Sequence, residues 1–594
     1  MTKYPEPLPA LLLTGGVAFG AFVWLQPSWV WIVSSALMMI AGLFLTRSLR
    51  FGILCCGVCA GLVSGYIHRP VALPDELYGQ NREWRGEVEK VYHGRNSQTC
   101  VVNVGDNIRI RALICAAAPE VEASDTISFS GQAEPNNLLE RTGVPGLSSG
   151  VGTDGPIAAS VLVDGLDFKI ISSKSPGFLE HLADSFSHTI YSSGLNIETA
   201  ALLCSAWLGT DDVTPRLRQS FRSLGLSHLL CVSGMHVGLV AVLIALLLRP
   251  LAYFQHRGRL RYFIIVALVW VYACLTGLQP SAFRAAAMIT VFYVVEYFQL
   301  GHNSLNTLFL AAAIVIVANP WWIFSIGFQL SVMAVLGIIV LVPYLNPFTG
   351  KHAKKYTAAG NALVLPIAVM ITTFPIMVYW FASISLVSIF ANIIAALIFP
   401  VFMFGGLLAA FALHLGCPHI IAALPIEGIT QLLNLLCESN PETTFVASRL
   451  YISDRSMVVL MLLLCCMLAV VRFGQRRYKA ITLPAGVAVM LAVVLIPGKP
   501  RREIIVYSSG GHATALICGL EHPLVASTHK KIRPTIPTER YLELQGYHED
   551  EVIVVPDGHS LGIVEHRHNI LTIGNTIINL QEAARVPDAF VITY

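Results

Sequence analysis

The chain has 594 residues, of which 55% are hydrophobic and 13% charged, and its formal net charge is +3. A soluble protein of this size has no core large enough to hide so much apolar surface, so the composition excludes a soluble enzyme or a soluble binding domain. It predicts a polytopic α-helical membrane protein. The first apolar run is followed at once by others, which is typical of permanent membrane spans and not of a cleaved signal peptide.

The N-terminal part of the chain, residues 1–67, is predicted to form three membrane spans. They lie near residues 8–25, 29–45 and 51–67. The loop between the second and the third contains Arg47 and Arg50. The positive-inside rule therefore places this loop, and with it the amino terminus, in the cytoplasm.

The polar segment that follows, residues 68–190, alternates in short strand-like runs separated by Gly, Asn and Asp. The clearest runs are 84–91, 99–104, 108–113 and 126–132. They predict a small outer β-barrel domain. The segment has more acidic than basic residues, which argues against a strong general grip on DNA. Cys100 and Cys115, on neighbouring strands, form a candidate disulfide for an oxidising outer compartment, with two free thiols as the alternative.

Residues 191–420 are predicted to form a central membrane core, and residues 421–497 a second group of membrane segments. The candidate spans lie near residues 227–248, 262–277, 280–298, 304–319, 326–345, 361–381, 384–401, 402–416, 456–471 and 483–496. With the N-terminal group the total is about 11 to 13 spans, and an amphipathic piece near 429–436 stays at the outer surface. The basic loops between spans then face the cytoplasm. The last part of the chain, residues 498–594, becomes a second outer domain.

A short basic helix leads into the central core. Thr214 and Pro215 predict its start and Gly225 its end. Three arginines occupy its polar faces, namely Arg216, Arg218 and Arg222. Apolar residues at helical spacing fill the remaining face, so we expect this helix to lie on the membrane surface.

Polar side chains interrupt the apolar runs that follow. They are His228, Ser233, His236, Arg284 and Gln329. A polar group at membrane depth is costly, so each predicts either a structural hydrogen bond or a functional contact. For His236 the structural alternative is a satisfied core histidine, and for Gln329 it is hydrogen bonding between helices. Arg284 either extends outward to the headgroups or faces a wet cavity.

Glycines accompany these polar positions. Gly234 and Gly238 form a small-xxx-small step, and with Gly327 they are predicted to let helices pack closely. Ser233 and His236 lie three residues apart on one helix, but no third residue orients them, which argues against an intramembrane enzyme. Helices interrupted by glycine and polar residues within one block indicate a shared polar pathway.

Five blocks of sequence resemble, in order and spacing, the competence domain of the ComEC family. They are GLSHLLCVSGMHVGLV, TGLQPSAFRAAAM, SLNTL, NPWWIFSIGFQLSVMAVLG and FPIMVYWFASISLVSIFANI, all within residues 199–415. That family consists of bacterial inner-membrane proteins thought to form the channel that carries transforming DNA into the cytoplasm as a single strand. The resemblance also implies that the outer β-domain is OB-fold-like.

The pattern of the ComEC family can be carried over to individual positions of this chain. It falls on Gly225, His228, Ser233, Gly234, His236, Gly238, Pro280, Ser281, Arg284, Asn306, Gly327, Phe328, Gln329, Ser331 and Asn392. The chain departs from it at Ser325, where the family usually has an acidic residue, and at Met235, which replaces a leucine. The proline expected soon after Asn392 is delayed to Pro400.

Within residues 498–594, the stretch IIVYSSGGHATALICGLEHPLVAS (504–527) resembles the opening hairpin of the metallo-β-lactamase-like domain that ends many ComEC proteins. Ala526 stands where the family has Asp, and the HxHxDH metal motif is absent, because His566 and His568 lack its Asp and its third His. A two-metal hydrolase needs more ligands than these. We therefore expect a truncated, non-catalytic remnant that binds no metal and has a packing or partner-binding role.

The expected function is a ComEC-type channel for transforming DNA, without enzyme activity and without a cofactor. A conduit for a polyanion needs spaced positive charge and polar contacts. The predicted DNA path is lined by Arg216, Arg218, Arg222, His228, Ser233, His236, Arg284 and Gln329. The alternative is a small-molecule transporter or permease of unknown substrate, because such proteins also have interrupted helices with polar residues at the midplane.

The expected setting is the bacterial inner (cytoplasmic) membrane, with the amino terminus inside and both polar domains outside. The expected partners are single-stranded DNA, membrane lipid, a DNA receptor, cytoplasmic motor proteins of the uptake machinery and a separate nuclease. The driving force is expected to come from a partner or from a gradient, because no stretch of the chain resembles an ATP-binding loop.

Overall fold

The structure is a computed structural model. The predicted second span (29–45) and most of the predicted first span (8–25) lie outside the residues that it describes. The described residues are 13–18, 49–67, 77, 80–93, 97–105, 108–115, 121, 124–135, 158–163, 168–172, 177–210, 213–214, 217–218, 221, 224–250, 260–299, 303–346, 357–381, 384–385, 387–419, 423–438, 446–447, 454–473, 476–495, 503–509, 512–518, 524–527, 553–555, 559–561, 564–567, 570–573, 576–580 and 589–593.

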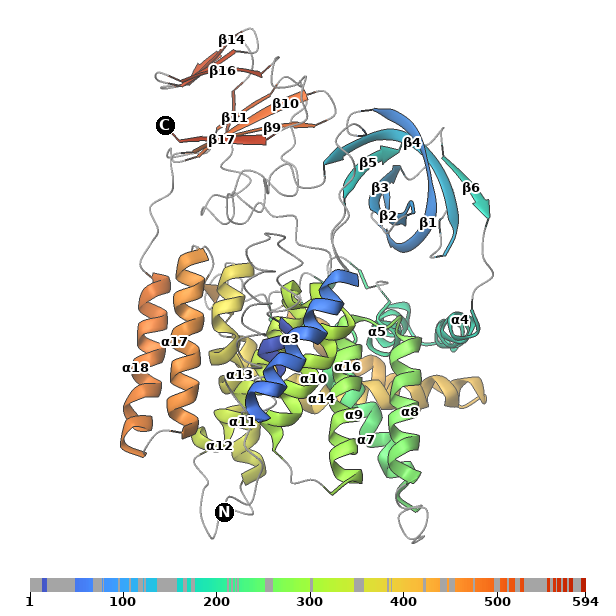
Figure 1. Ribbon diagram of the computed structural model, residues 1–594. Coiled ribbons are helices and arrows are strands. Elements are labelled where there is room, and N and C mark those ends of the chain that lie inside the picture. Colours follow the sequence, from blue (N-terminus) through green and yellow to red (C-terminus); the bar gives the residue numbers. More distant parts are fainter. Residues whose placement is uncertain are drawn as a thin grey trace.

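Helices make up most of the described chain, and Figure 1 shows them gathered in one block with the two sheet-containing parts at the same end of it. Their bounds are α3 (Leu49–Ile67), α4 (Phe178–Tyr191), α5 (Ile197–Leu208), α7 (Gly234–Leu247), α8 (Leu260–Leu275), α9 (Pro280–Tyr297), α10 (Ser304–Ala318), α11 (Ile326–Val340), α12 (Val342–Leu345), α13 (Thr357–Phe381), α14 (Val387–His414), α16 (Leu424–Glu438), α17 (Asp454–Phe473) and α18 (Arg476–Leu495). Local chemistry sets their starts. Pro280 occupies the first turn of α9, and Asn303 caps α10 by accepting the Leu305 N–H at 3.0 Å.

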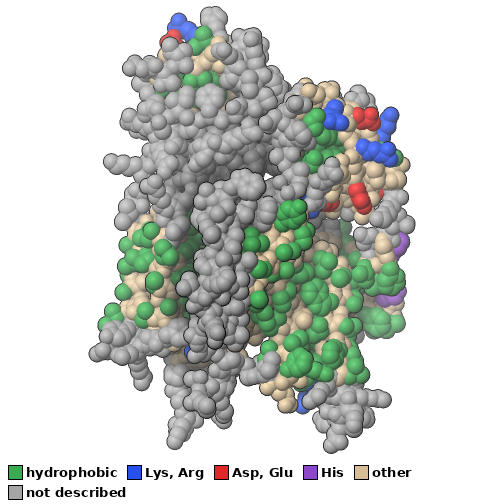
Figure 2. Space-filling model, viewed as in Figure 1, with side chains coloured by type: hydrophobic (Ala, Val, Ile, Leu, Met, Phe, Trp, Pro, Cys, Tyr) green, Lys and Arg blue, Asp and Glu red, His purple; other side chains and the backbone are tan. Residues whose placement is uncertain are grey.

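The outer surface of the helical block is apolar, as Figure 2 shows for one face. Leu397 of α14 is 72% exposed and Leu247 of α7 is 69% exposed. Large exposed apolar areas of this kind fit a lipid surface. Among the described residues, α14 and the stretch Ile326–Leu345 are long and apolar enough to cross a membrane, and further apolar helices are shorter. These observations support a membrane protein, whereas the number of spans and their orientation stay predictions.

Two predicted spans differ from the observed helices. The runs predicted at 384–401 and 402–416 form the single helix α14, because no polar residue separates them and the helix accommodates Pro400. The span predicted from residue 227 begins only at Gly234. Residues Ser227–Leu229 form a 3-10 turn instead, and Ser233 then caps α7.

Close packing joins helices that are distant in sequence. A Cβ built at Gly337 of α11 would lie 2.9 Å from the main-chain oxygen of Ala368 in α13, so glycine permits this approach. In the core of the block, the Trp207 indole donates to the main-chain oxygen of Met403 at 3.1 Å. The Tyr272 hydroxyl donates to the main-chain oxygen of Trp207 at 3.0 Å. These bonds hold α5, α8 and α14 together.

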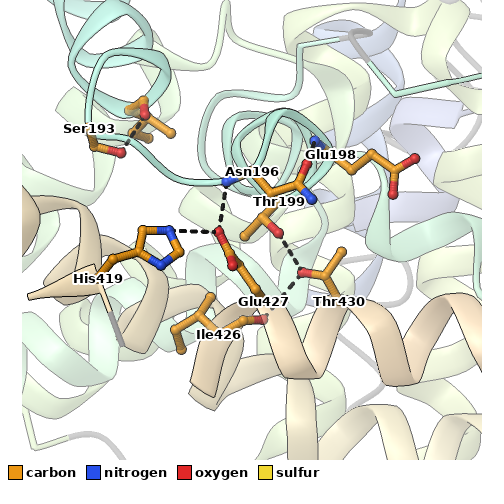
Figure 3. Close-up of polar contacts among 9 residues, drawn as sticks. Ser193, Asn196, Glu198, Thr199, His419, Ile426, Glu427 and Thr430 are labelled. Atoms are coloured by element: carbon orange, nitrogen blue, oxygen red, sulfur yellow. Dashed lines mark hydrogen bonds and ion pairs between the residues drawn. The ribbon is translucent and has the colours of Figure 1, made fainter. Parts of the chain in front are cut away.

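The amphipathic helix α16 is fastened to the start of α5 (Figure 3). Glu427 Oε1 accepts the Asn196 N–H at 2.8 Å and lies 3.4 Å from His419 Nε2. The Thr199 hydroxyl donates to Thr430 Oγ1 at 3.1 Å. The predicted amphipathic piece is therefore a helix tied to the core by polar contacts, while its placement at the outer surface stays a prediction.

The N-terminal part contains a curved six-stranded sheet, in which the four predicted strands are confirmed. Its strands are β1 (Asn81–His93), β2 (Ser97–Asn103), β3 (Arg109–Cys115), β4 (Thr126–Pro135), β5 (Ala159–Val163) and β6 (Phe168–Ser172). The hydrogen-bonded order is β1-β2-β3-β5-β4-β6, and β1 also pairs with β4. Alternate side chains point inward and form a core that includes Trp84, Ile110 and Phe129.

The candidate disulfide between Cys100 and Cys115 is wrong. Cys100 is a free, buried thiol. In the register of β2 and β3 it lies opposite Ala112, whereas Cys115 lies opposite Ser97. Three residues along a strand span about 10 Å, and a disulfide needs Cα atoms within about 7 Å. Sequence patterning predicted the two strands but not their register.

The C-terminal part has two sheets. Their strands are β9 (Glu503–Ser509), β10 (His512–Cys518), β11 (Leu524–Ser527), β12 (Ile553–Val554), β13 (His559–Leu561), β14 (Val564–Arg567), β15 (Ile570–Ile573), β16 (Thr576–Asn579) and β17 (Ala589–Thr593). The orders are β12-β11-β10-β9-β17 and β13-β14-β15-β16. One hydrophobic core contains Val506 of the first sheet and Leu571 of the second. The predicted hairpin is confirmed, because Ser509 pairs with His512.

Candidate functional site

Three helices, α7, α9 and α11, begin close to one another. The Ser281 hydroxyl of α9 donates to the main-chain oxygen of Val232, just before α7. A Cβ built at Gly327, in the first turn of α11, would lie 3.7 Å from Arg284 Nη2. The amino ends of helices carry partial positive charge. Sequence blocks that are far apart in the chain therefore meet in one region of positive potential.

Ser233 and His236 together form the cap of α7. Ser233 Oγ accepts the Met235 N–H at 3.3 Å, and the Ser233 N–H donates to His236 Nδ1 at 3.0 Å. Ser233 Oγ also lies 2.7 Å from His236 Nδ1. Because Nδ1 accepts the main-chain N–H, a neutral ring carries its hydrogen on Nε2. The three-residue spacing therefore builds a helix cap, with a histidine in the place usually taken by Glu or Gln.

The His236 ring is fully buried and packs edge-on against Phe399, with 4.9 Å between ring centroids. Its Nε2 has no hydrogen-bond partner among the described residues. Ser233 and His236 are thus engaged with each other and with the main chain at the start of α7. This arrangement gives no support to a catalytic pair.

Arg284 points into the helical block. The residue is 7% exposed, and its guanidinium carbon lies 6.0 Å from the centroid of the Phe328 ring. Its Nε is buried without a hydrogen-bond partner in the described part of the chain. It lines a small cavity between α9, α10 and α11. Of the two alternatives drawn from the sequence, the structure supports the inward-facing one.

Gln329 connects three elements by its side-chain amide. Its Nε2 donates to the main-chain oxygen of Ile323 at 3.1 Å, in the 3-10 turn Pro320–Phe324. Its Oε1 accepts the Trp380 indole N–H of α13 at 3.3 Å. Hydrogen bonding between helices, the structural alternative for Gln329, is confirmed. Trp380 had not been singled out from the sequence, because its neighbours Phe381 and Tyr379 give the run an ordinary aromatic composition.

The basic helix before α7 is described only in part. Arg216 and Arg222 lie outside the described residues. Arg218 is exposed, and its Nη2 donates to the main-chain oxygen of Val213 at 3.4 Å. Gly225 has a φ of 69°, which fits the predicted helix end. His228 lies in the turn that follows and is exposed.

The three glycines predicted to pack helices behave differently. A Cβ built at Gly234 would lie 3.9 Å from Ala285 Cβ of α9, an ordinary contact distance. At Gly238 it would meet no described atom within 4 Å, so the described residues give no support to close packing there. Gly327 faces the Arg284 guanidinium instead of another helix backbone. Spacing alone could not distinguish these cases.

No group of three or more His, Cys, Asp or Glu side chains among the described residues is placed to hold a metal ion. His566 is buried in the C-terminal part, with Nδ1 3.0 Å from the main-chain oxygen of Val555. His568 lies outside the described residues.

Comparison with known proteins identifies the family. A family model described as "Competence protein" matches residues 208–496, the part that contains α7 to α18. ComE operon protein 3 of Bacillus subtilis is 26% identical over 175 residues, which is 30% of this chain and 21% of that protein. Competence protein ComA of Neisseria gonorrhoeae is 29% identical over 187 residues, 30% of this chain and 26% of that protein. Residues 208–496 of the chain therefore form a domain of the competence protein family.

Other relatives of this competence-family chain have no assigned role in their names. An uncharacterized protein of Aquifex aeolicus is 27% identical over 222 residues, 37% of this chain and 50% of that protein. The matches therefore span between 21% and 50% of these three relatives' own length. No solved structure matches the chain.

Proposed function

We propose that this competence-family protein acts in DNA uptake and carries transforming DNA across the bacterial inner membrane as a single strand. The burial of the positively charged Arg284 side chain is the observation on which the proposal rests. Arg284 is a buried cation without an ion pair in the described part of the chain, and it lies within the region that matches the competence family. The description of the matching family model and the name of one relative, competence protein ComA, refer to competence, which supports the same role.

The physical basis of the proposal is the charge of the strand. A single strand is a polyanion with aromatic bases, so a conduit needs positive charge that holds each phosphate weakly. Arg284 and the amino ends of α7, α9 and α11 provide that charge inside the helical block. Arg216, Arg218 and Arg222 would form a positively charged funnel at the outer entrance of the path. The exposed His228 lies in the sequence between these arginines and the start of α7.

The remaining predicted path residues act in a different way in this proposal. Ser233 and His236 are committed to the cap of α7, and Gln329 is committed to Ile323 and Trp380. We propose that they fix the positions of the helices around the path and do not bind the strand. Contact with phosphates then falls to Arg284 and to the outer arginines.

We also propose that the N-terminal sheet is an OB-like barrel that docks partners or gates the path. Strand β1 pairs with both β2 and β4, and β3 pairs in parallel with β5, and these pairings support the barrel. Trp84 and Phe129 are 5% and 0% exposed. They are therefore part of the core and offer no stacking surface to bases, which favours docking or gating over strand binding.

The proposed setting is the one expected from the sequence. The amino terminus lies in the cytoplasm and both sheet-containing parts lie outside, which agrees with their position at one end of the helical block (Figure 1). A DNA receptor delivers the strand, a cytoplasmic motor or a gradient drives it, and a separate nuclease removes its complement. The protein itself is not an enzyme and uses no cofactor, and its C-terminal part binds a partner.

The test follows labelled duplex DNA in cells with the wild-type protein, a deletion, or the double variant Arg222→Ala with Arg284→Ala. The readout separates label bound outside from label that reaches the cytoplasm. Arg567→Ala is the matched control, because Arg567 has an exposed side chain in the C-terminal part. We expect the deletion and the double variant to stop internalisation while outside binding persists.

Unchanged internalisation in the deletion strain would contradict the proposal. A small-molecule transporter would then be the better account, and the double variant would impair solute flux and leave transformation intact. Loss of internalisation in the deletion but not in the double variant would keep the DNA role and remove the two arginines from it.

A further inference from the structure

Arg284 borders a cavity whose chemistry the DNA path does not explain. The walls come from α9, α10 and α11 and include Leu308, Ala311, Phe328 and Ser331. Arg284 and Ser331 supply its polar atoms. The cavity has room for about one water molecule.

The positive charge of Arg284 has no counter-charge among the described residues. Its Nε is buried without a hydrogen-bond partner, and no ion pair involves it there. Helices α7, α10 and α11 contain no Asp or Glu. Glu296, the one acidic residue of α9, is about 18 Å further along the helix at 1.5 Å per residue. A guanidinium keeps its charge at neutral pH, so the charge is present and has no compensating charge in the described part of the chain.

Helix dipoles increase the positive potential at this point. Arg284 lies about one turn from the amino end of α9, where a cation is unfavourable. It also faces the first turn of α11 at Gly327. At the start of α9, Gln279 makes no side-chain cap. The Arg284 guanidinium and the amino ends of α9 and α11 thus place positive charge around one small cavity. Positive charge of this kind is the electrostatic requirement for an anion site.

We infer that this cavity binds one small inorganic anion of the size of chloride. An isolated buried charge is too costly for a single water to offset, whereas an anion neutralises it. The anion would accept hydrogen bonds from the guanidinium and from the Ser331 hydroxyl. Space for about one water molecule is too small for a tetrahedral oxyanion such as phosphate. A strand that reached Arg284 would have to displace this anion and part the helices, because the resting cavity has no room for a phosphodiester.

The test measures thermal unfolding of the purified full chain in detergent at constant ionic strength. Sodium chloride replaces sodium gluconate stepwise, and sodium phosphate is a separate arm. The proteins are the wild type, Arg284→Gln, Ser331→Ala and the exposed control Arg567→Gln. Ligand binding to the folded state raises the unfolding midpoint, so we expect chloride to raise it by about 2–5 °C in the wild type and in the control.

The two cavity variants make the result decisive. Arg284→Gln is expected to lose the chloride response, and Ser331→Ala to need several-fold more chloride for the same shift. Ser331→Ala keeps the charge and removes one hydroxyl, so it remains informative if Arg284→Gln fails to fold. A wild type that does not respond to chloride, a response unchanged in both variants, or an equal response to phosphate would each overturn the inference. Loss of DNA internalisation is a separate readout, so either proposal can fail alone.

Discussion

The guanidinium carbon of Arg284 lies 6.0 Å from the centroid of the Phe328 ring. This contact joins the start of α9 to the start of α11, two elements that α10 separates in the sequence. Together with the bond from Ser281 to Val232, it brings the amino ends of three helices to one place. The proposed DNA path and the proposed anion site both depend on this convergence.

Gly225 is expected to tolerate no side chain. Its φ of 69° is in the left-handed region, and a Cβ there would lie 2.6 Å from Ser388 Cβ of α14. Gly225→Ala should lower the free energy of unfolding by about 2 kcal/mol or more, from backbone strain and overpacking together. Gly416→Ala is the matched control, because Gly416 has a φ of 84° with no atom within 4 Å of the built Cβ. It should cost only about 1 kcal/mol. Equal losses in thermal unfolding would show that the contact with α14 is absent.

Ser233 is expected to act as a helix cap. Ser233→Ala removes the oxygen that accepts the Met235 N–H, so the unfolding free energy should fall by about 1 kcal/mol. Ser233→Thr keeps a hydroxyl and should lose much less. The measurement is the midpoint of thermal unfolding in detergent. An intramembrane nucleophile would behave differently, since Ser233→Ala would then leave stability unchanged and abolish a reaction.

Glu427 is expected to stabilise the start of α5. Glu427→Ala leaves the exposed Asn196 N–H without the acceptor it has at 2.8 Å, which should cost about 1 kcal/mol. The side chain of His419 is 51% exposed, so His419→Ala should change the unfolding free energy by less than about 1 kcal/mol. The two single variants and the double variant form a cycle that isolates the ion pair. A larger effect from His419 than from Glu427 would contradict the assignment.

Cys100 is expected to resist alkylation in the folded protein. Burial, and secondarily the negative charge of Asp125, raise the pKa of the Cys100 thiol to about 11, so the reactive thiolate is scarce at pH 8. Cys417 is exposed at the end of α14 and should react quickly. Mass spectrometry after iodoacetamide treatment measures both positions. Labelling of Cys100 as fast as that of Cys417, or a peptide linked through Cys100 and Cys115 without reductant, would contradict a buried free thiol at Cys100.

Much of the fold could be predicted from the sequence, because apolar runs and alternating strands are local signals. The four strands predicted in residues 68–190 and the starts of α9, α10 and α11 follow from such patterns. Helix α5 was missed, because its short apolar run is not long enough to indicate a span. Two predicted spans form the single helix α14, because no polar residue separates them and the helix accommodates Pro400.

The candidate site could be predicted less completely, because its geometry depends on contacts between helices. The sequence indicated that Arg284 is unusual, but its direction is set by Phe328 and the walls of α10. The spacing of Ser233 and His236 suggested a pair and could not show that both cap α7. The spacing of Gly234 and Gly238 predicted packing at both, yet of these two positions only Gly234 would bring a built Cβ within 4 Å of another described helix. Spacing along one helix does not specify what the neighbouring helices place opposite it.

The most direct test of the central claim is site-specific crosslinking to DNA during uptake. A photoreactive residue is introduced at Ser331, which lines the cavity beside Arg284, and at Leu397 of α14, which is 72% exposed on the apolar surface. Cells are irradiated while labelled DNA is being internalised, and the crosslinked DNA on the purified protein is quantified. We predict labelling from position 331 and none from position 397. DNA linked from position 397 and not from position 331, or from neither while uptake proceeds, would contradict a DNA path between α9, α10 and α11.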